Sequence, residues 1–285
     1  MKTINYASRE RTSARGPLAL VRSVMLPRAR WHRGRPLPLV RSVTLYHPKL
    51  PLAFEGLRIV QVSDVHAGTF MPPPRLDQVR ATVEALAPDL VVFTGDQLDR
   101  RDVDADLFVE GFAGISAPLG VFGVLGNHDH LAGAPLALEA LKAVGVTPLV
   151  NSAAVLEAGG SRVLLAGVDD LEAGPGWGPD FSVLWRTQAD FRMLLCHQPR
   201  GWSDAFAAGA NITLAGHTHG GQIGFRAGDL SVARLGTPFV AGPYLRGEEL
   251  LYVSRGVGVG AVPIRFGSPP EVDLLTLRRG NTAAS

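Results

Sequence analysis

Residues 57–66 read Leu-Arg-Ile-Val-Gln-Val-Ser-Asp-Val-His, a run rich in β-branched residues that turns polar at Ser63. This pattern is typical of a buried strand that ends in a loop. Asp64 and His66 follow the strand directly, and residues two apart in an extended segment point to the same side. We therefore expect these two side chains to reach one ion.

Four further motifs follow predicted strands in the same way. The strand at 89–94 ends in Gly95-Asp96-Gln97-Leu98-Asp99, and the strand at 121–125 ends in Gly126-Asn127-His128-Asp129. The strand at 191–196 ends in His197, and the strand at 211–215 ends in Gly216-His217-Thr218-His219-Gly220-Gly221-Gln222. Five of the eight histidines of the chain lie in these motifs. Open α/β sheets carry their sites at the carboxyl ends of strands, so the motifs are expected to meet.

Each motif taken alone also has an ordinary structural interpretation. Asp and His at a strand end often cap turns, and a lone His197 beside Cys196 is more often a buried, hydrogen-bonded residue than a ligand. Five such motifs in series are hard to assign to packing. Asp96 has two carboxylate oxygens, so it is able to bridge two metals.

Helices alternate with the strands in the first half of the chain. Three prolines at 72–74 and apolar residues at helical spacing predict a helix that Pro88 ends, and further helices are expected near 105–115 and 135–144. Residues 40–46 alternate like an edge strand. Strands joined by helical crossovers predict a largely parallel sheet.

Five later segments are also strand-like: 162–168, 191–196, 211–215, 250–254 and 271–277. The connections after Gly220 are short and rich in glycine, so we expect these segments to form a second, more antiparallel sheet packed on the first. No internal repeat or linker interrupts residues 40–280, which indicates one domain.

Composition sets the class of protein. The chain has 285 residues, of which 46% are hydrophobic and 19% charged, enough to bury a sizeable core, so global disorder is excluded. Its single cysteine, Cys196, permits no internal disulfide and no thiolate zinc cluster. A metal would therefore have nitrogen and oxygen ligands, and the compartment is expected to be reducing.

Charge divides the chain into an arm and a body. Residues 1–50 hold 11 of the 28 Lys and Arg but one of the 26 acidic residues, a net charge of +10 that leaves −8 for the remainder. We expect a basic, poorly structured arm at 1–38, one folded domain that carries the five motifs at 39–280, and a loose tail at 281–285. The arm is too interrupted for a bilayer span or a secretory signal.

The arm has two further interpretations. It is a loose leader, or its run Arg28, Arg30, Trp31, Arg33 and Arg35 contacts an anionic membrane surface. Nucleic acid is the weaker alternative, because the acidic body would repel a polyanion. We expect a cytoplasmic protein, with peripheral contact at the membrane surface as the sharper alternative.

The five motifs together resemble the signature of the calcineurin-like metallophosphoesterase superfamily, from about residue 55 to 277. The Gly220-Gly221-Gln222 extension, the Val168-Asp169-Asp170 turn and Pro269-Pro270-Glu271 further resemble a bacterial, often membrane-associated branch. That branch includes phosphodiesterases and enzymes that hydrolyse UDP-diacylglucosamine. The resemblance implies an α/β fold of two packed mixed β-sheets flanked by helices, a four-layer sandwich.

The resemblance also implies a ligand set for two divalent metals. Asp64, His66, Asp96 and His219 would hold one ion, and Asp96, Asn127, His197 and His217 the other. Mixed oxygen and imidazole ligands suit Mn²⁺, Fe or Zn²⁺. A hydroxide bridging the metals would attack phosphorus in line.

His128 would stay free of metal as general acid or as donor to the phosphoryl oxygen, oriented by Asp99 or Asp129. Arg100 and Arg255 are candidates to bind a substrate phosphate, although a solvated loop charge and a structural ion pair are the more ordinary interpretations. Asp169 and Asp170 are expected to be loop carboxylates, and Cys196 a buried strand residue.

The preferred function is hydrolysis of a phosphodiester or pyrophosphate, on a small, lipid-linked or nucleotide-linked substrate. A metal-binding scaffold without catalysis is the alternative from another class, since folds keep a site shape after losing reactivity. A scaffold has no need of His128, which favours the enzyme. A nuclease is a third alternative, and the acidic body argues against it.

Overall fold

The computed structural model describes residues 38–222, 237–260 and 264–281, and three short strands elsewhere: β1 (Thr3–Asn5), β11 (Gly224–Phe225) and β12 (Leu230–Ser231). The expected arm at 1–38 and tail at 281–285 therefore lie largely outside the described residues. Of the arm, Thr3–Asn5 pairs in parallel with a strand of the body.

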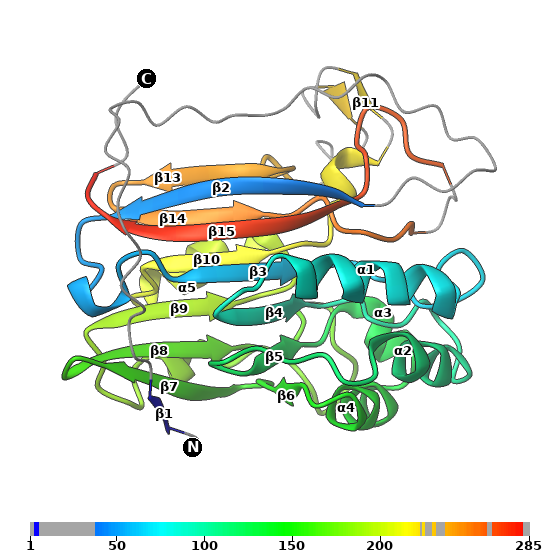
Figure 1. The fold of residues 1–285 in the computed structure, drawn as a ribbon, viewed down its shortest axis with the longest axis horizontal. Coiled ribbons are helices and arrows are strands. Elements are labelled where there is room, and N and C mark those ends of the chain that lie inside the picture. Colours follow the sequence, from blue (N-terminus) through cyan, green and yellow to red (C-terminus); the bar gives the residue numbers. More distant parts are fainter. Residues whose placement is uncertain are drawn as a thin grey trace.

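Two sheets form the centre of the molecule (Figure 1). The first contains six strands in the order β2 (Leu39–His47), β15 (Glu271–Arg279), β3 (Arg58–Val62), β4 (Leu90–Thr94), β5 (Val121–Val124) and β6 (Thr147–Pro148). The second contains seven in the order β1, β7 (Ser152–Ala158), β8 (Ser161–Gly167), β9 (Phe191–Leu195), β10 (Ile212–Ala215), β14 (Glu249–Val253) and β13 (Gly242–Arg246). Strands β11 and β12 pair with each other.

Helices follow the first-sheet strands as predicted. They are α1 (Pro73–Ala85), α2 (Asp104–Phe112), α3 (Asn127–Ala132) and α4 (Ala134–Ala143), with α5 (Trp202–Ala207) between β9 and β10. Short 3₁₀ turns are η1 (Leu52–Phe54), η2 (Phe181–Leu184), η3 (Pro199–Gly201) and η4 (His219–Gly221). None of the helices in the described ranges is long and apolar enough to span a lipid bilayer.

Three apolar cores separate four layers. One lies between the sheets, where Ile59, Phe122 and Leu195 meet. A second packs α1, α2 and α4 on the outer face of the first sheet, through residues such as Phe93 and Phe108. The third packs α5 on the outer face of the second sheet. The expected four-layer α/β sandwich of mixed sheets is confirmed.

The distribution of the strands between the two sheets differs from the prediction. Strand β15 returns to the first sheet, where it pairs in parallel with β2 and antiparallel with β3. The second sheet is not mainly antiparallel, because β8, β9, β10 and β14 run parallel to one another. Parallel neighbours require long crossovers, and the chain supplies them through η2 and α5. The expected edge position of β2 is confirmed.

A buried polar group lies on β15. The Tyr252 hydroxyl donates to Asp273 Oδ1 at 2.6 Å, and Glu271 is buried on the same strand. Burial and the nearby charge of Glu271 raise the pKa of Asp273 well above its ordinary value. The folded state therefore retains a proton that the unfolded chain releases above about pH 4.

The pKa of Asp273 predicts a pH-dependent effect of Asp273→Asn, which keeps an acceptor for Tyr252 and removes the ionisable group. A carboxyl whose folded pKa is raised contributes stability below its unfolded pKa and loses it as pH rises towards the folded value. The variant is expected to gain about 1 kcal/mol over the parent for each pH unit in that interval. Urea unfolding at pH 5 and pH 8 measures the difference, with the exposed Asp106→Asn as control. An Asp273→Asn gain that is the same at both pH values contradicts the assignment.

Candidate metal centre

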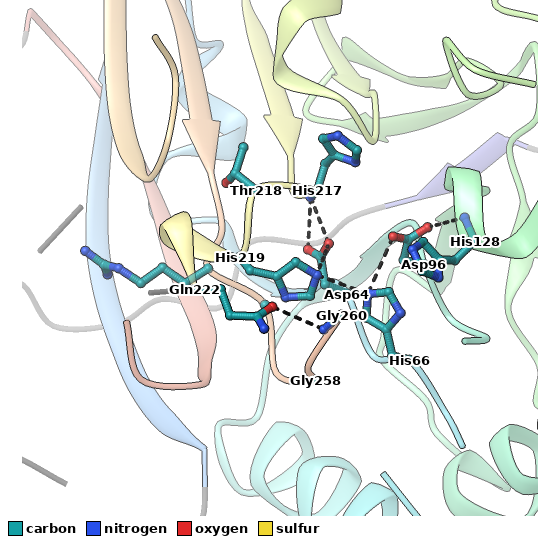
Figure 2. Close-up of polar contacts among 12 residues, drawn as sticks. Asp64, His66, Asp96, His128, His217, Thr218, His219, Gln222, Gly258 and Gly260 are labelled. Atoms are coloured by element: carbon teal, nitrogen blue, oxygen red, sulfur yellow. Dashed lines mark hydrogen bonds and ion pairs between the residues drawn. The ribbon is translucent and has the colours of Figure 1, made fainter. Parts of the chain in front are cut away.

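The five motifs meet at the carboxyl ends of strands from both sheets. Backbone hydrogen bonds join the loops there: Asp64 N–H donates to Gly95 O at 3.0 Å, and His66 N–H donates to Asp96 O at 2.9 Å. Gly258 N–H, from the loop after β14, donates to Asp64 O at 2.8 Å. The motifs are therefore held by the main chain as well as by their side chains (Figure 2).

One half of the site contains Asp64, His66 and His219, whose ligand atoms lie within 4.8 Å of one another. His66 Nε2 is 3.1 Å from His219 Nε2, and His219 Nε2 is 3.6 Å from Asp64 Oδ1. The His217 main-chain N–H donates to both carboxylate oxygens of Asp64, at 2.9 and 3.1 Å, which fixes the carboxylate.

The other half contains Asp96, His197 and His217, also within 4.8 Å of one another. His217 Nδ1 lies 3.2 Å from His197 Nε2 and 3.1 Å from Asn127 Oδ1. Asn127 thus adds an amide oxygen to this half. All six clustered Asp and His residues are buried or nearly so.

Asp96 belongs to both halves. Its Oδ2 lies 3.2 Å from His197 Nε2 and 3.6 Å from His66 Nε2. Its Oδ1 accepts from the His128 main-chain N–H at 2.9 Å. Figure 2 shows Asp96 between His66 and His128, with Asp64 on the side of His219.

Main-chain carbonyls select the tautomers of two histidines. His197 Nδ1–H donates to Thr94 O at 2.8 Å, which leaves the Nε2 lone pair directed at Asp96 and His217. His128 Nδ1–H donates to Asp99 O at 2.7 Å and leaves Nε2 available in the same way. Fixed tautomers of this kind are what ligand and acid-base histidines require.

The titratable groups shift in opposite directions across the site. Burial lowers the pKa of His197, but the charge of Asp96 outweighs burial and raises that pKa well above its ordinary value. Burial and the neighbouring His197 lower the pKa of His217. Burial opposes ionisation of Asp96, yet the charges of His197 and His66 lower its pKa strongly. Asp96 is therefore ionised beside these two histidines.

The donor set fits divalent cations. His197 Nε2 and His217 Nδ1 lie 3.2 Å apart, with a carboxylate oxygen of Asp96 3.2 Å from His197 Nε2, so nitrogen and oxygen donors gather at one point. His66 Nε2 and His219 Nε2 likewise lie 3.1 Å apart, with Asp64 Oδ1 3.6 Å from His219 Nε2. Imidazole nitrogens with carboxylate and amide oxygens are the ligands that Mn²⁺, Fe and Zn²⁺ accept.

The backbone at the ligands is left-handed. Asp64, His66, Asp96, His217 and His219 have φ values of 52°, 47°, 55°, 71° and 52°. The expectation that Asp64 and His66 lie in an extended segment is therefore wrong. Positive φ is costly for residues other than glycine, at about 1–3 kcal/mol each, and such strain clusters at functional sites. Here it turns each side chain inward from the strand end.

Neighbouring glycines leave no room for side chains. A Cβ at Gly126 would lie 2.2 Å from Asp96 Oδ1, and one at Gly216 would lie 2.4 Å from Asp64 Oδ2. A Cβ at Gly95, whose φ is +99°, would lie 2.4 Å from His197 Nδ1. The glycines of the motifs thus allow the backbone of one loop to contact the ligands of another.

Asp99 and Asp129 have different contacts. Besides the carbonyl bond to His128, Asp99 Oδ1 lies 3.5 Å from Nδ1 of both His66 and His128. The Asp129 carboxylate accepts from the main-chain N–H groups of Leu98 and Gly126, each at 2.9 Å, and so joins two of the loops. Burial, reinforced by the charge of Asp96, raises the pKa of Asp129 to about 7. Of the two residues predicted to orient His128, these contacts favour Asp99.

The two arginines predicted to bind a substrate phosphate have different surroundings. Arg100 is exposed, and its main-chain N–H donates to Asp104 Oδ2 at 3.1 Å. Arg255 Nη1 forms an ion pair with the buried Glu271 at 2.8 Å. This pair matches the ordinary structural interpretation of Arg255. Asp169 is buried and bonds His130 Nε2 at 2.8 Å, so it is more than a loop carboxylate.

Arg265 was missed by sequence reasoning. It is buried, and its Nη2 lies 3.0 Å from His219 Nδ1, while its Nη1 donates to Arg255 O at 2.8 Å. Burial, followed by the positive charge of Arg265, lowers the pKa of His219 well below its ordinary value. The sequence offers one weak signal for this role, which is the position of Arg265 between the apolar residues Ile264 and Phe266.

Fold and site together define a four-layer α/β protein with adjoining clusters of Asp and His that are able to hold metal ions. The family model described as Calcineurin-like phosphoesterase matches residues 57–221. The chain belongs to this family of metal-dependent phosphoester hydrolases, and the resemblance of the motifs is confirmed.

Three curated relatives support the assignment. The uncharacterized metallophosphoesterase YkuE of Bacillus subtilis is 33% identical over 245 residues, 84% of this chain and 85% of that protein. Phosphodiesterase YaeI of Escherichia coli is 31% identical over 236 residues, 77% of this chain and 82% of that protein. A transmembrane protein with metallophosphoesterase domain from Danio rerio is 33% identical over 255 residues, 85% of this chain and 58% of that protein.

Gly95→Ala is expected to weaken metal binding. The new Cβ displaces the His197 ring and breaks its bond to Thr94 O, a kind of loss that costs about 10- to 100-fold in metal affinity. Gly160→Ala is the matched control, because Gly160 also has positive φ, at +76°, but has nothing within 4 Å of the added atom. Titration calorimetry with Mn²⁺ compares the two. Equal affinities in both variants refute the role of the close contact.

Proposed function

We propose that the chain is a phosphodiester or pyrophosphate hydrolase that uses two divalent cations. The observation that carries the proposal is the shared position of Asp96 between two donor clusters, with His128 beside it. The name of the E. coli relative, a phosphodiesterase, supports the diester class.

The distances between the donor atoms divide the ligands between the two proposed ions. Asp64, His66 and His219 would hold one ion, and His197, His217 and Asn127 the other, with Asp96 between them. When bound, the cations polarise the phosphoryl oxygens and lower the pKa of water. The donors are held by main-chain hydrogen bonds, so little reorganisation is needed for binding.

His128 is positioned to handle the leaving oxygen. Its Nδ1–H donates to Asp99 O at 2.7 Å, and the Asp99 carboxylate lies 3.5 Å from the same nitrogen. The protonated Nε2–H then donates to the oxygen that departs from phosphorus. A scaffold without catalysis would not require a histidine held in this tautomer.

Two variants separate binding from catalysis. His128→Ala is expected to lower kcat on bis(4-nitrophenyl) phosphate by about 10²- to 10⁴-fold and to keep its metal, because His128 acts on the leaving group. Asp96→Asn is expected to lose activity and metal together. Activity assays with elemental analysis of the same samples measure both effects. Unchanged turnover in either variant contradicts the proposal.

We also propose that the basic arm contacts anionic membrane surfaces. The net charge of +10 over residues 1–50 and the run from Arg28 to Arg35 support this contact, and one relative is named as a transmembrane protein. The bulk of the chain is acidic, so the attraction would come from the arm alone.

Vesicle flotation tests the membrane contact with the full-length chain. Substituting Arg28, Arg30, Arg33 and Arg35 by Gln is expected to abolish flotation with vesicles of 30% phosphatidylserine, at about 1 kcal/mol for each charge lost. Substituting the surface residues Arg75, Arg80, Arg186 and Arg200 by Gln gives a control of the same charge. Equal flotation of both sets would rule out the arm as the contact.

A further inference from the structure

A cavity of about 410 Å³ lies beside the second half of the metal centre. Its lining comes from α3, from the start of α4 and from the loop after β8. The lining includes Asn127, His130, Leu131 and Trp177, and one acidic residue, Glu172. Its volume lies in the range of pockets that hold small organic ligands.

The cavity is mostly apolar and carries exposed large side chains. Leu131 is 63% exposed and Trp177 41% exposed. Large apolar residues grouped next to a polar site are typical of a ligand pocket. Among the described residues that line the cavity, none is Lys or Arg and one, Glu172, is acidic, so the lining offers no cation to a second phosphate.

A buried ion pair holds the cavity in shape. His130 Nε2 lies 2.8 Å from Asp169 Oδ1, and Asp169 Oδ2 accepts from Gly178 N–H at 2.9 Å, next to Trp177. The His130 and Trp177 rings meet edge to face, with centroids 5.5 Å apart. The loop that carries Trp177 is thus fastened to α3, and the pocket is preformed.

Helix α3 contributes residues both to the cavity and to the metal centre. Asn127, His130 and Leu131 are spaced i, i+3 and i+4, so they share one face of the helix. Asn127 Oδ1 also lies 3.1 Å from His217 Nδ1, in the metal centre. His128 is one residue further along, is not among the residues that line the cavity, and has its Nδ1 2.7 Å from Asp99 O. The cavity is therefore separate from His128, the residue proposed to act on the leaving group.

We propose that this cavity, the Trp177 pocket, binds an aromatic ester group that remains on phosphorus while the other ester group leaves. This inference rests on the proposed phosphodiesterase activity and narrows its substrate to diesters with an aromatic substituent. An indole and an imidazole at a fixed angle suit a flat ring, which gains edge or face contacts and loses little conformational freedom. A pyrophosphate would place its second charge in an apolar pocket and is disfavoured.

Two substrates that differ only in the retained group test the proposal in the Mn²⁺-loaded full chain. Phenyl 4-nitrophenyl phosphate and methyl 4-nitrophenyl phosphate release the same leaving group. Trp177→Ala is expected to lower kcat/KM about 10-fold for the phenyl ester and less than about 2-fold for the methyl ester. Leu131→Ala should act in the same direction. Trp185→Ala, which removes a tryptophan that is 70% exposed outside the pocket, should change neither.

Binding of phenyl phosphate and methyl phosphate, measured by calorimetry, separates this inference from the activity on which it rests. Tighter binding of phenyl phosphate that is lost in Trp177→Ala supports the pocket even if neither diester is hydrolysed, in which case the proposed function alone fails. Hydrolysis of both diesters with equal effects of Trp177→Ala overturns the pocket and leaves the phosphodiesterase intact. Equal binding of both monoesters by the parent chain also overturns it.

Discussion

The site depends on one carboxylate that faces two sets of imidazoles. Asp96 lies 3.2 Å from His197 and 3.6 Å from His66, and it is buried with both. An anion in such surroundings is stable only when positive charge is supplied on both sides. Cations held by the two donor clusters would meet that requirement, and ring nitrogens of the surrounding histidines lie close together in each cluster.

The rest of the fold stabilises the ligand residues in a strained backbone conformation. Five ligand residues adopt left-handed backbone conformations, and the glycines beside them bring main chain against carboxylate and imidazole. Strain of this size persists only where the surrounding structure over-determines it. Three apolar cores and the hydrogen bonds between loops of the two sheets provide that constraint.

Much of this could be predicted from local sequence. Residues such as Asp96 and His197 directly follow runs with clear strand character, and strand ends of parallel sheets meet at one edge, so their grouping followed from topology. The sheet to which β15 belongs could not be predicted, because pairing of Glu271–Arg279 with β2 and β3 is non-local. The left-handed φ of Asp64 and His66 also escaped detection, since neither residue is a glycine. Arg265 was missed because its partners are main-chain carbonyls and a histidine distant in sequence.

Electron paramagnetic resonance of the Mn²⁺-loaded chain tests most directly whether one carboxylate joins two ions. The account predicts the spectrum of an exchange-coupled manganese pair, with two ions bound to each chain. A six-line spectrum of isolated Mn²⁺ at full loading would contradict it, because ions that share the Asp96 carboxylate cannot be magnetically independent.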